Sequence, residues 1–137
     1  MLKTTGVILF LVWNSWKDIR KKEISLVITC VFAFLGVMTA LYNRNVNVMY
    51  FVPPLVGGCF LGLSAVSGNQ IGAGDGVLLI ALGTVLEMEE YLRTLCLALG
   101  SCGLWALILL GILRKKKTTE LPFVPFVLLG YVGGLLL

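Results

Sequence analysis

Six long apolar runs, separated by short polar stretches, constrain the fold of this chain more than any other feature. The runs lie near residues 5–17, 24–42, 50–67, 75–88, 91–113 and 121–137. A helix needs about 20 apolar residues to cross the hydrocarbon core of a bilayer, so the first and fourth runs are short for a full span. Hydrophobic residues make up 58% of the 137 residues and charged residues 13%, whereas a soluble domain has about 45–50% and about 25%. The sequence therefore predicts an all-α membrane protein of about six transmembrane helices.

The polar stretches between the runs are too short to form a separate soluble domain, which requires at least about 50 residues. We therefore expect residues 1–137 to form a single membrane-embedded domain. The first run ends in Trp13, Asn14, Ser15 and Trp16, without the small-residue pattern of a signal-peptide cleavage site. This run is expected to be a retained first span.

The positive charges predict the orientation of the chain. Four lie between residues 17 and 22, and four more lie at residues 114–117. With six spans, both groups fall on one side of the membrane, and only Lys3, Arg44 and Arg93 fall on the other. Because basic residues collect on the cytoplasmic side, both termini are expected outside. The loop that ends at Asp75 is then expected in the cytoplasm.

The composition excludes several kinds of chemistry. The chain has no histidine, which removes His-activated nucleophiles and the H-E-x-x-H type of metalloprotease. Its four cysteines, Cys30, Cys59, Cys96 and Cys102, lie in apolar runs without a C-x-x-C pair, so they are expected to be small buried residues and not zinc ligands. Despite the net charge of +4, the basic residues flank apolar runs, which does not favour nucleic-acid binding. Carboxylate chemistry remains, with no metal or cofactor expected.

Asp18 and Asp75 are the only aspartates in the chain, and both lie at ends of apolar runs. The predicted orientation, which rests on basic residues and span parity alone, places both on the cytoplasmic side. An ionisable group near hydrocarbon is a functional-site hypothesis by default. Two carboxylates about 3 Å apart share a proton, so that one can activate a water as a base while the other acts as an acid. The pair therefore predicts a catalytic dyad for hydrolysis.

Gly72 and Gly74 directly precede Asp75 in the sequence. Residues without a side chain allow a second backbone to come close, so these glycines are candidates for binding a substrate strand. The alternative interpretation is a flexible glycine-rich loop that also includes Gly68 and Gly76. The Gly-x-Gly-Asp string alone does not decide between the two.

Three segments together resemble the signatures of the prepilin peptidases, which are intramembrane aspartic proteases of the GxGD type. They are Asp-Ile-Arg-Lys-Lys-Glu-Ile at 18–24, Gly-Ala-Gly-Asp at 72–75 and Leu-Pro-Phe-Val-Pro-Phe at 121–126. The resemblance spans nearly the whole chain and implies the short form without an N-terminal methyltransferase segment. It implies that Asp18 and Asp75 are catalytic. The implied substrate is the leader of a type IV prepilin-like precursor, cut at the cytoplasmic face of the bacterial inner membrane.

The chain departs from the family pattern at two places. Ile24, Ser25 and Leu26 stand where the family commonly has Ile-Pro-Asn, and Gly76 and Val77 stand where it has a lysine after the second aspartate. We expect the Ser25 hydroxyl to cap the second helix. The absence of this lysine is expected to affect either the affinity for substrate or the pKa values of the aspartates.

The third segment offers further site-shaping candidates: Pro122, Phe123 and Pro125. The alternative interpretation is that the two prolines only begin a helix, where their missing N–H groups would be unpaired anyway.

Two other classes of function remain possible for such a chain. A small six-span transporter usually carries polar groups near the bilayer midplane in repeated halves, whereas the middles of these runs are almost wholly apolar. A non-catalytic membrane protein of pilin assembly would not need both aspartates. The prepilin peptidase interpretation is therefore preferred, with a prepilin-like protein and the lipid bilayer as partners.

Overall fold

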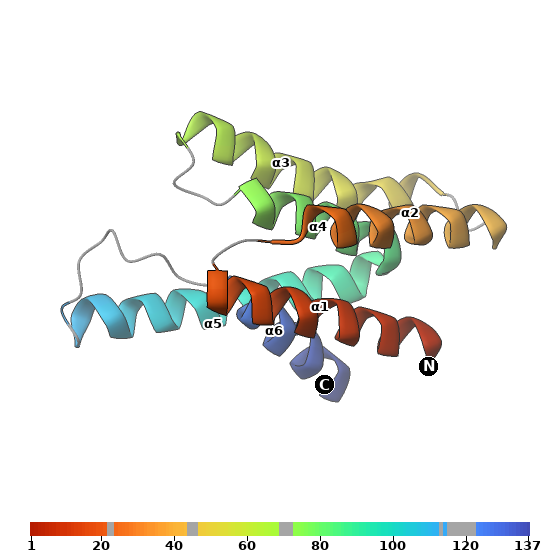
Figure 1. The fold of residues 1–137 in the computed structure, drawn as a ribbon. Coiled ribbons are helices and arrows are strands. Elements are labelled where there is room, and N and C mark those ends of the chain that lie inside the picture. Colours follow the sequence, from red (N-terminus) through yellow and green to blue (C-terminus); the bar gives the residue numbers. More distant parts are fainter. Residues whose placement is uncertain (22–23, 44–46, 69–72, 113, 115–122) are drawn as a thin grey trace.

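The computed structural model describes residues 1–21, 24–43, 47–68, 73–112, 114 and 123–137. Within these residues the chain forms six α-helices, one short 3-10 helix and no strand, so the predicted all-α class is confirmed. The elements are α1 (Leu2–Lys21), α2 (Leu26–Tyr42), η1 (Val48–Phe51), α3 (Val52–Val66), α4 (Ala73–Val85), α5 (Met88–Gly111) and α6 (Val124–Leu136) (Figure 1). Each predicted apolar run corresponds to one of the six α-helices.

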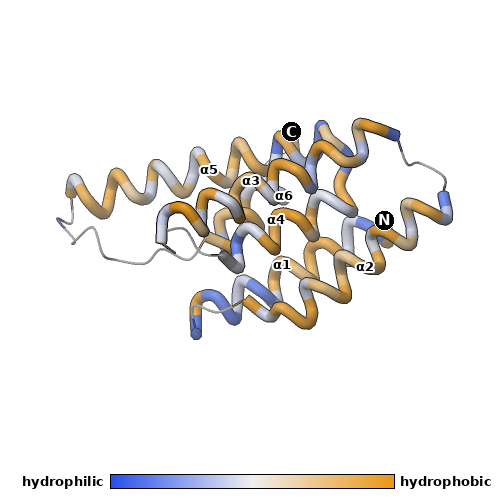
Figure 2. The backbone as a smooth tube through the Cα atoms, turned by 90° about the horizontal axis from the view of Figure 1, so that it is seen from above, coloured by the Kyte–Doolittle hydropathy of each residue, from blue (hydrophilic) through white to orange (hydrophobic). Residues whose placement is uncertain are grey.

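Two helical segments are long and apolar enough to cross a membrane: Val48–Val66, which joins η1 to α3, and α5. α2, α4 and α6 are also apolar but shorter. Apolar residues run along all six helices, and polar residues gather mainly near the helix ends (Figure 2). This pattern is that of a membrane protein. Six complete spans with both termini outside stay a prediction.

The helices form two layers (Figure 1). In one layer α4 packs against α2 and α3, and in the other α6 packs against α1 and α5. Only the α1–α2 and α4–α5 connections pass from one layer to the other, because the remaining connections join helices of the same layer. The first and the last two helices of the chain thus share a layer.

A common core holds the layers together. Its buried apolar residues come from α1, α4, α5 and α6 and from Leu86 between α4 and α5, and α2 adds the partly buried Phe32, whose ring stacks on Phe10 with centroids 4.1 Å apart. Glycines bring the helices of each layer close: a Cβ on Gly57 of α3 would lie 2.5 Å from the backbone N of Ile80 in α4, and one on Gly130 of α6 would lie 2.6 Å from the Thr94 carbonyl oxygen of α5. Small residues at such contacts are typical of helix packing in membranes.

The expectation that the cysteines are buried is wrong for most of them. Cys30, Cys59 and Cys96 are exposed, and Cys102 is partly buried. The three exposed residues lie on helix faces that point away from the core, where many large apolar side chains are exposed as well. In a bilayer these faces meet acyl chains, so an apolar residue there has no need of burial in protein.

The helix ends differ from the predicted ones by a few residues, for local reasons. α5 begins at Met88 because Glu87 and Glu90 form a capping box, in which the Glu90 carboxylate accepts the Glu87 N–H at 3.4 Å. α6 begins at Val124, with Pro125 in its first turn, where a proline does not interrupt helical hydrogen bonds. α1 continues past the apolar run to Lys21.

Candidate active site

Asp18 lies in the last turn of α1, on the face that packs into the protein. Its side chain is only 8% exposed. The buried residues of α1 recur every three or four positions, from Val7 through Leu11 to Asn14 and Asp18, which is the spacing of one helix face. The apolar stripe of α1 therefore ends in a buried carboxyl at the end of the helix.

The start of α6 holds this carboxyl. The backbone N–H of Val124 donates a hydrogen bond to Oδ2 of Asp18 at 3.2 Å, and the N–H of Phe123 also interacts with the carboxyl. The first N–H groups of a helix have no partner within the helix and favour a nearby negative charge. Burial raises the pKa of Asp18 above its ordinary value, while these two N–H groups act in the opposite direction.

Asn14 lies one turn before Asp18 and is completely buried. Its Nδ2 donates to the Phe10 carbonyl at 3.1 Å, and its Oδ1 accepts the backbone N–H of Ser25 at 3.3 Å. Asn14 therefore joins α1 to the start of α2, close to the end that carries Asp18.

The predicted cap by the Ser25 hydroxyl is wrong. Ser25 does occupy the N-cap position of α2, but its side chain makes no capping hydrogen bond. Its backbone N–H instead donates to Asn14, and its carbonyl accepts the Thr29 hydroxyl at 2.8 Å. The side-chain amide of Asn14, not the serine hydroxyl, fixes the beginning of this helix.

Asp75 lies in the first turn of α4, partly buried between two glycines. A Cβ on Gly74 would lie 3.1 Å from Cδ1 of Ile24, and one on Gly76 would lie 2.9 Å from the backbone N of Leu61 in α3. The first turn of α4 can therefore lie close to both the start of α2 and the middle of α3. The two glycines position Asp75 at this crowded point.

The two aspartates come from different layers and lie close enough for the charge of Asp18 to act on Asp75. Cys102 of α5 is also within electrostatic range of Asp75. Ser25 contacts Asn14 of α1, and the adjacent Ile24 lies beside Gly74 of α4, so both aspartates lie at one end of the bundle, at the boundary between the layers. Helix packing joins groups that lie far apart in the sequence.

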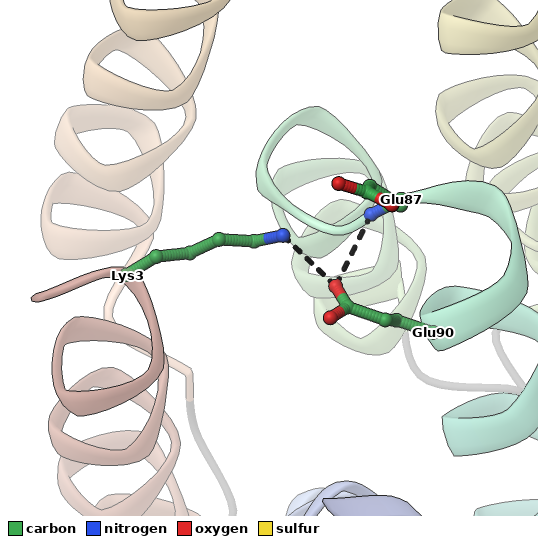
Figure 3. Close-up of polar contacts among 3 residues, drawn as sticks. All are labelled: Lys3, Glu87 and Glu90. Carbon is green, nitrogen blue, oxygen red and sulfur yellow. Dashed lines mark hydrogen bonds and ion pairs between the residues drawn. The ribbon is translucent and has the colours of Figure 1, made fainter. Parts of the chain in front are cut away.

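The other end of α1 is tied to α5 (Figure 3). The Nζ of Lys3 lies 2.9 Å from a carboxylate oxygen of Glu90, and the same oxygen accepts the N–H of Glu87. Both partners of the ion pair are partly exposed, so the pair adds little to stability. Its effect is to connect the beginning of the helix that carries Asp18 to the capping box of α5.

The remaining predicted site residues are only partly described. Gly72 and Pro122 lie outside the described residues. Phe123 is placed next to Asp18 through its backbone N–H. Pro125 occupies the first turn of α6, in agreement with the interpretation that it helps to begin a helix.

Sequence reasoning missed three residues around the aspartates: Asn14 and Val124 near Asp18, and Cys102 within electrostatic range of Asp75. Asn14 had a usable signal, because it is a polar residue in an apolar run and lies four positions before Asp18. Val124 had none, since it acts through its backbone N–H. Cys102 lies on α5, whose sequence is almost uniformly apolar and so does not show which side of the helix faces the protein core.

The fold and the site define a class of protein: a small, mostly apolar helical bundle of membrane type, with two aspartates at one end. The model of the type IV leader peptidase family matches residues 6–110. The chain therefore belongs to the type IV leader peptidase family, as the sequence motifs predicted. The matched region contains both aspartates and Gly74 and ends before Phe123. No curated protein and no solved structure matches the chain.

Proposed function

We propose that this protein is a membrane aspartic endopeptidase that removes the leader of type IV prepilin-like precursors. Asp18 and Asp75 are its catalytic pair, and water is the nucleophile. The observation that carries the proposal is that Asp18 and Asp75 lie at one end of the bundle, within electrostatic range of each other, in a member of a leader peptidase family. The chain contains no aspartate other than these two.

The proposed reaction needs one proton shared between the two carboxyls. The ionised aspartate removes a proton from water as the water oxygen attacks the scissile carbonyl carbon. The protonated aspartate donates a hydrogen bond to the developing oxyanion, and a proton then passes to the leaving amine as the C–N bond breaks. Because the protons belong to the pair, neither aspartate is assigned a fixed role.

The surroundings of Asp18 and Asp75 support such a pair. The first turn of α6 supplies N–H groups that orient the Asp18 carboxyl. Burial and the nearby second carboxyl both favour retention of one proton. We further propose that Gly72, Gly74, Pro122, Phe123 and Pro125 shape the cleft that receives the substrate.

The proposed site faces the cytoplasm from the inner membrane of a bacterial cell. The support is the excess of basic residues in the stretches that adjoin α1 and α5 at the end that carries Asp18. A precursor whose leader stays in the cytoplasm and whose helix enters the membrane would meet the dyad at this interface.

Substitution of each aspartate tests the proposal. Asp18→Asn and Asp75→Asn preserve side-chain size but remove the carboxyl, so each variant is expected to cleave a co-expressed prepilin-like precursor roughly 100-fold more slowly or worse. Glu89→Gln is the matched control, because it removes an exposed carboxylate near the start of α5; its cleavage rate should stay near that of the wild type. Immunoblots of precursor and mature protein measure the rates.

Unchanged cleavage by either asparagine variant would rule out the dyad. A wild-type protein that binds the precursor in a stable complex without cutting it would instead support the non-catalytic role in pilin assembly. Circular dichroism of the purified variants establishes that lost cleavage does not reflect lost helix.

A further inference from the structure

A hollow of about 450 Å³ runs along the outer face of α1. Its described lining residues all belong to this helix: Leu9, Val12, Trp13, Trp16, Lys17, Arg20 and Lys21. Their spacing of three and four places them on one helix face. Asp18 lies on the other face, in the protein interior. The hollow is therefore a feature separate from the proposed dyad, although α1 carries both the hollow and Asp18.

The two large aromatic residues of this face are exposed. The exposed fractions of Trp13 and Trp16 are 55% and 61%. Tryptophan is enriched where a membrane protein crosses from hydrocarbon to headgroups, since its ring is apolar and its N–H is polar. The position of these residues near the cytoplasmic end of α1 fits that depth.

The lining changes in character along α1. Leu9, Val12 and Trp13 form the apolar part, and Lys17, Arg20 and Lys21 form a cationic end. The guanidinium of Arg20 lies 4.8 Å from the centroid of the Trp16 ring, a cation–π arrangement that holds the charge over the hollow. In the described part of the chain, the ion pairs found involve other basic residues, Lys3 and Arg93.

We propose that this hollow binds an anionic phospholipid of the cytoplasmic leaflet. The phosphate lies among Lys17, Arg20 and Lys21, and an acyl chain lies along Leu9, Val12 and the tryptophan rings. Such a ligand matches both ends of the lining, whereas an apolar helix of another protein would cover the tryptophans and leave the cations without a counter-charge. The inference rests on the proposed membrane orientation but not on the proposed peptidase reaction.

Occupation of the hollow would set the depth of α1 in the membrane. Charge pairing with headgroups holds the cationic end at the interface, and Asp18 lies within the same turns of the helix. The lipid therefore acts on the site through the helix and makes no contact with the reacting atoms.

Tryptophan quenching by brominated lipids tests the site directly. The chain contains three tryptophans, so Trp105→Phe leaves only Trp13 and Trp16 as reporters. The purified variant in an uncharged detergent is titrated with brominated phosphatidylglycerol and, separately, with brominated phosphatidylcholine. We expect half-maximal quenching at a several-fold lower mole fraction of the anionic lipid. Equal quenching by the two lipids would overturn the proposal.

Charge variants in the Trp105→Phe background distinguish a site from general attraction. Arg20→Gln should weaken anionic-lipid quenching about fivefold, as expected for one interfacial cation. Arg114→Gln removes an exposed charge beyond the end of α5 and should leave quenching unchanged. An equal effect of the two variants would overturn the proposal.

Two further measurements close the test. The double variant Asp18→Asn/Asp75→Asn should leave lipid quenching unchanged, which separates this inference from the peptidase mechanism. The lipid site would be contradicted if an apolar peptide displaced the brominated anionic lipid and the protein showed no preference between the two lipids. The hollow would then be assigned to a helix of another protein.

Discussion

The sequence singles out Asp18 as a candidate but cannot predict the environment of its side chain. Its type and its place at the end of an apolar run predict a functional carboxyl, and the charge bias predicts that this carboxyl lies on the cytoplasmic side. Asn14 could have been found by the same logic, since it lies on the same helix face four positions earlier. The hydrogen bond from Val124 could not, because any residue at that position would offer the same N–H group.

A carboxyl pair that shares one proton predicts a bell-shaped dependence of kcat/KM on pH. At low pH both carboxyls are protonated and no base is present, while at high pH both are ionised and no acid is present. Burial raises the pKa of Asp18, and the neighbouring carboxylate further opposes the second ionisation. We therefore expect the alkaline limb to lie well above the ordinary pKa of an aspartate. Initial rates of precursor cleavage in detergent across the pH range measure both limbs.

Circular dichroism at each pH provides the control for this profile, because a fall in rate that accompanies loss of helix would not report on the dyad. A rate that rises through one ionisation and then stays constant to high pH, with the helix intact, would contradict the need for a protonated partner.

At the scale of helices, the sequence predicted where the helices lie better than it predicted which side of each helix faces the core. Six apolar runs became six helices, and Glu87 with Glu90 set the beginning of α5 in a way that a capping-box pattern can signal. The exposed positions of Cys30, Cys59 and Cys96 were not predicted. Lipid tails are as apolar as leucine, so the lipid-facing and the core-facing sides of a membrane helix differ little in hydrophobicity.

Glycine positions carry part of this missing information, as two adjacent residues of α3 illustrate. A Cβ on Gly57 would lie 2.5 Å from the backbone N of Ile80, whereas one on Gly58 would meet nothing within 4 Å. Gly57→Ala is therefore expected to force α3 and α4 apart and to lower the free energy of unfolding by about 1–3 kcal/mol. Gly58→Ala should be neutral or stabilising by up to about 1 kcal/mol. Unfolding in mixed detergent micelles, followed by circular dichroism, measures both changes.

The two substitutions are chemically identical, and Gly58→Ala thus controls for helix propensity. Equal unfolding free energies for the two variants would mean that α3 and α4 do not approach each other as closely at Gly57 as the structure indicates.

At the scale of the whole molecule, the arrangement of layers determines where the two aspartates lie relative to each other. Asp18 belongs to the layer of α1, α5 and α6, and Asp75 to the layer of α2, α3 and α4. Charge bias and span parity predicted that both lie at the same end. They could not predict that the two aspartates lie within electrostatic range of each other, because that depends on which helices pack together.

The predicted orientation can be tested at the two ends of α3. In a background with Cys30, Cys59, Cys96 and Cys102 changed to alanine, Asn47→Cys places a thiol before η1, and Ser67→Cys places one after α3 on the side of Asp75. Neither change alters a charge, so the basic residues that set the orientation remain. We expect a membrane-impermeant maleimide to label Asn47→Cys in intact spheroplasts and to label Ser67→Cys only after permeabilisation, as read from a gel shift.

The reverse pattern would place the carboxyl pair on the outer side of the membrane and would contradict cleavage at the cytoplasmic face, whatever the asparagine variants show. Labelling of both thiols in intact spheroplasts would mean that Val48–Val66 does not span the bilayer, although its length and composition allow it. Only the expected pattern brings the positive charges, the hollow on α1 and the aspartates to the cytoplasmic leaflet. That coincidence is what a leader-removing enzyme requires, because its substrate's leader and the headgroups that position α1 must be met from one side.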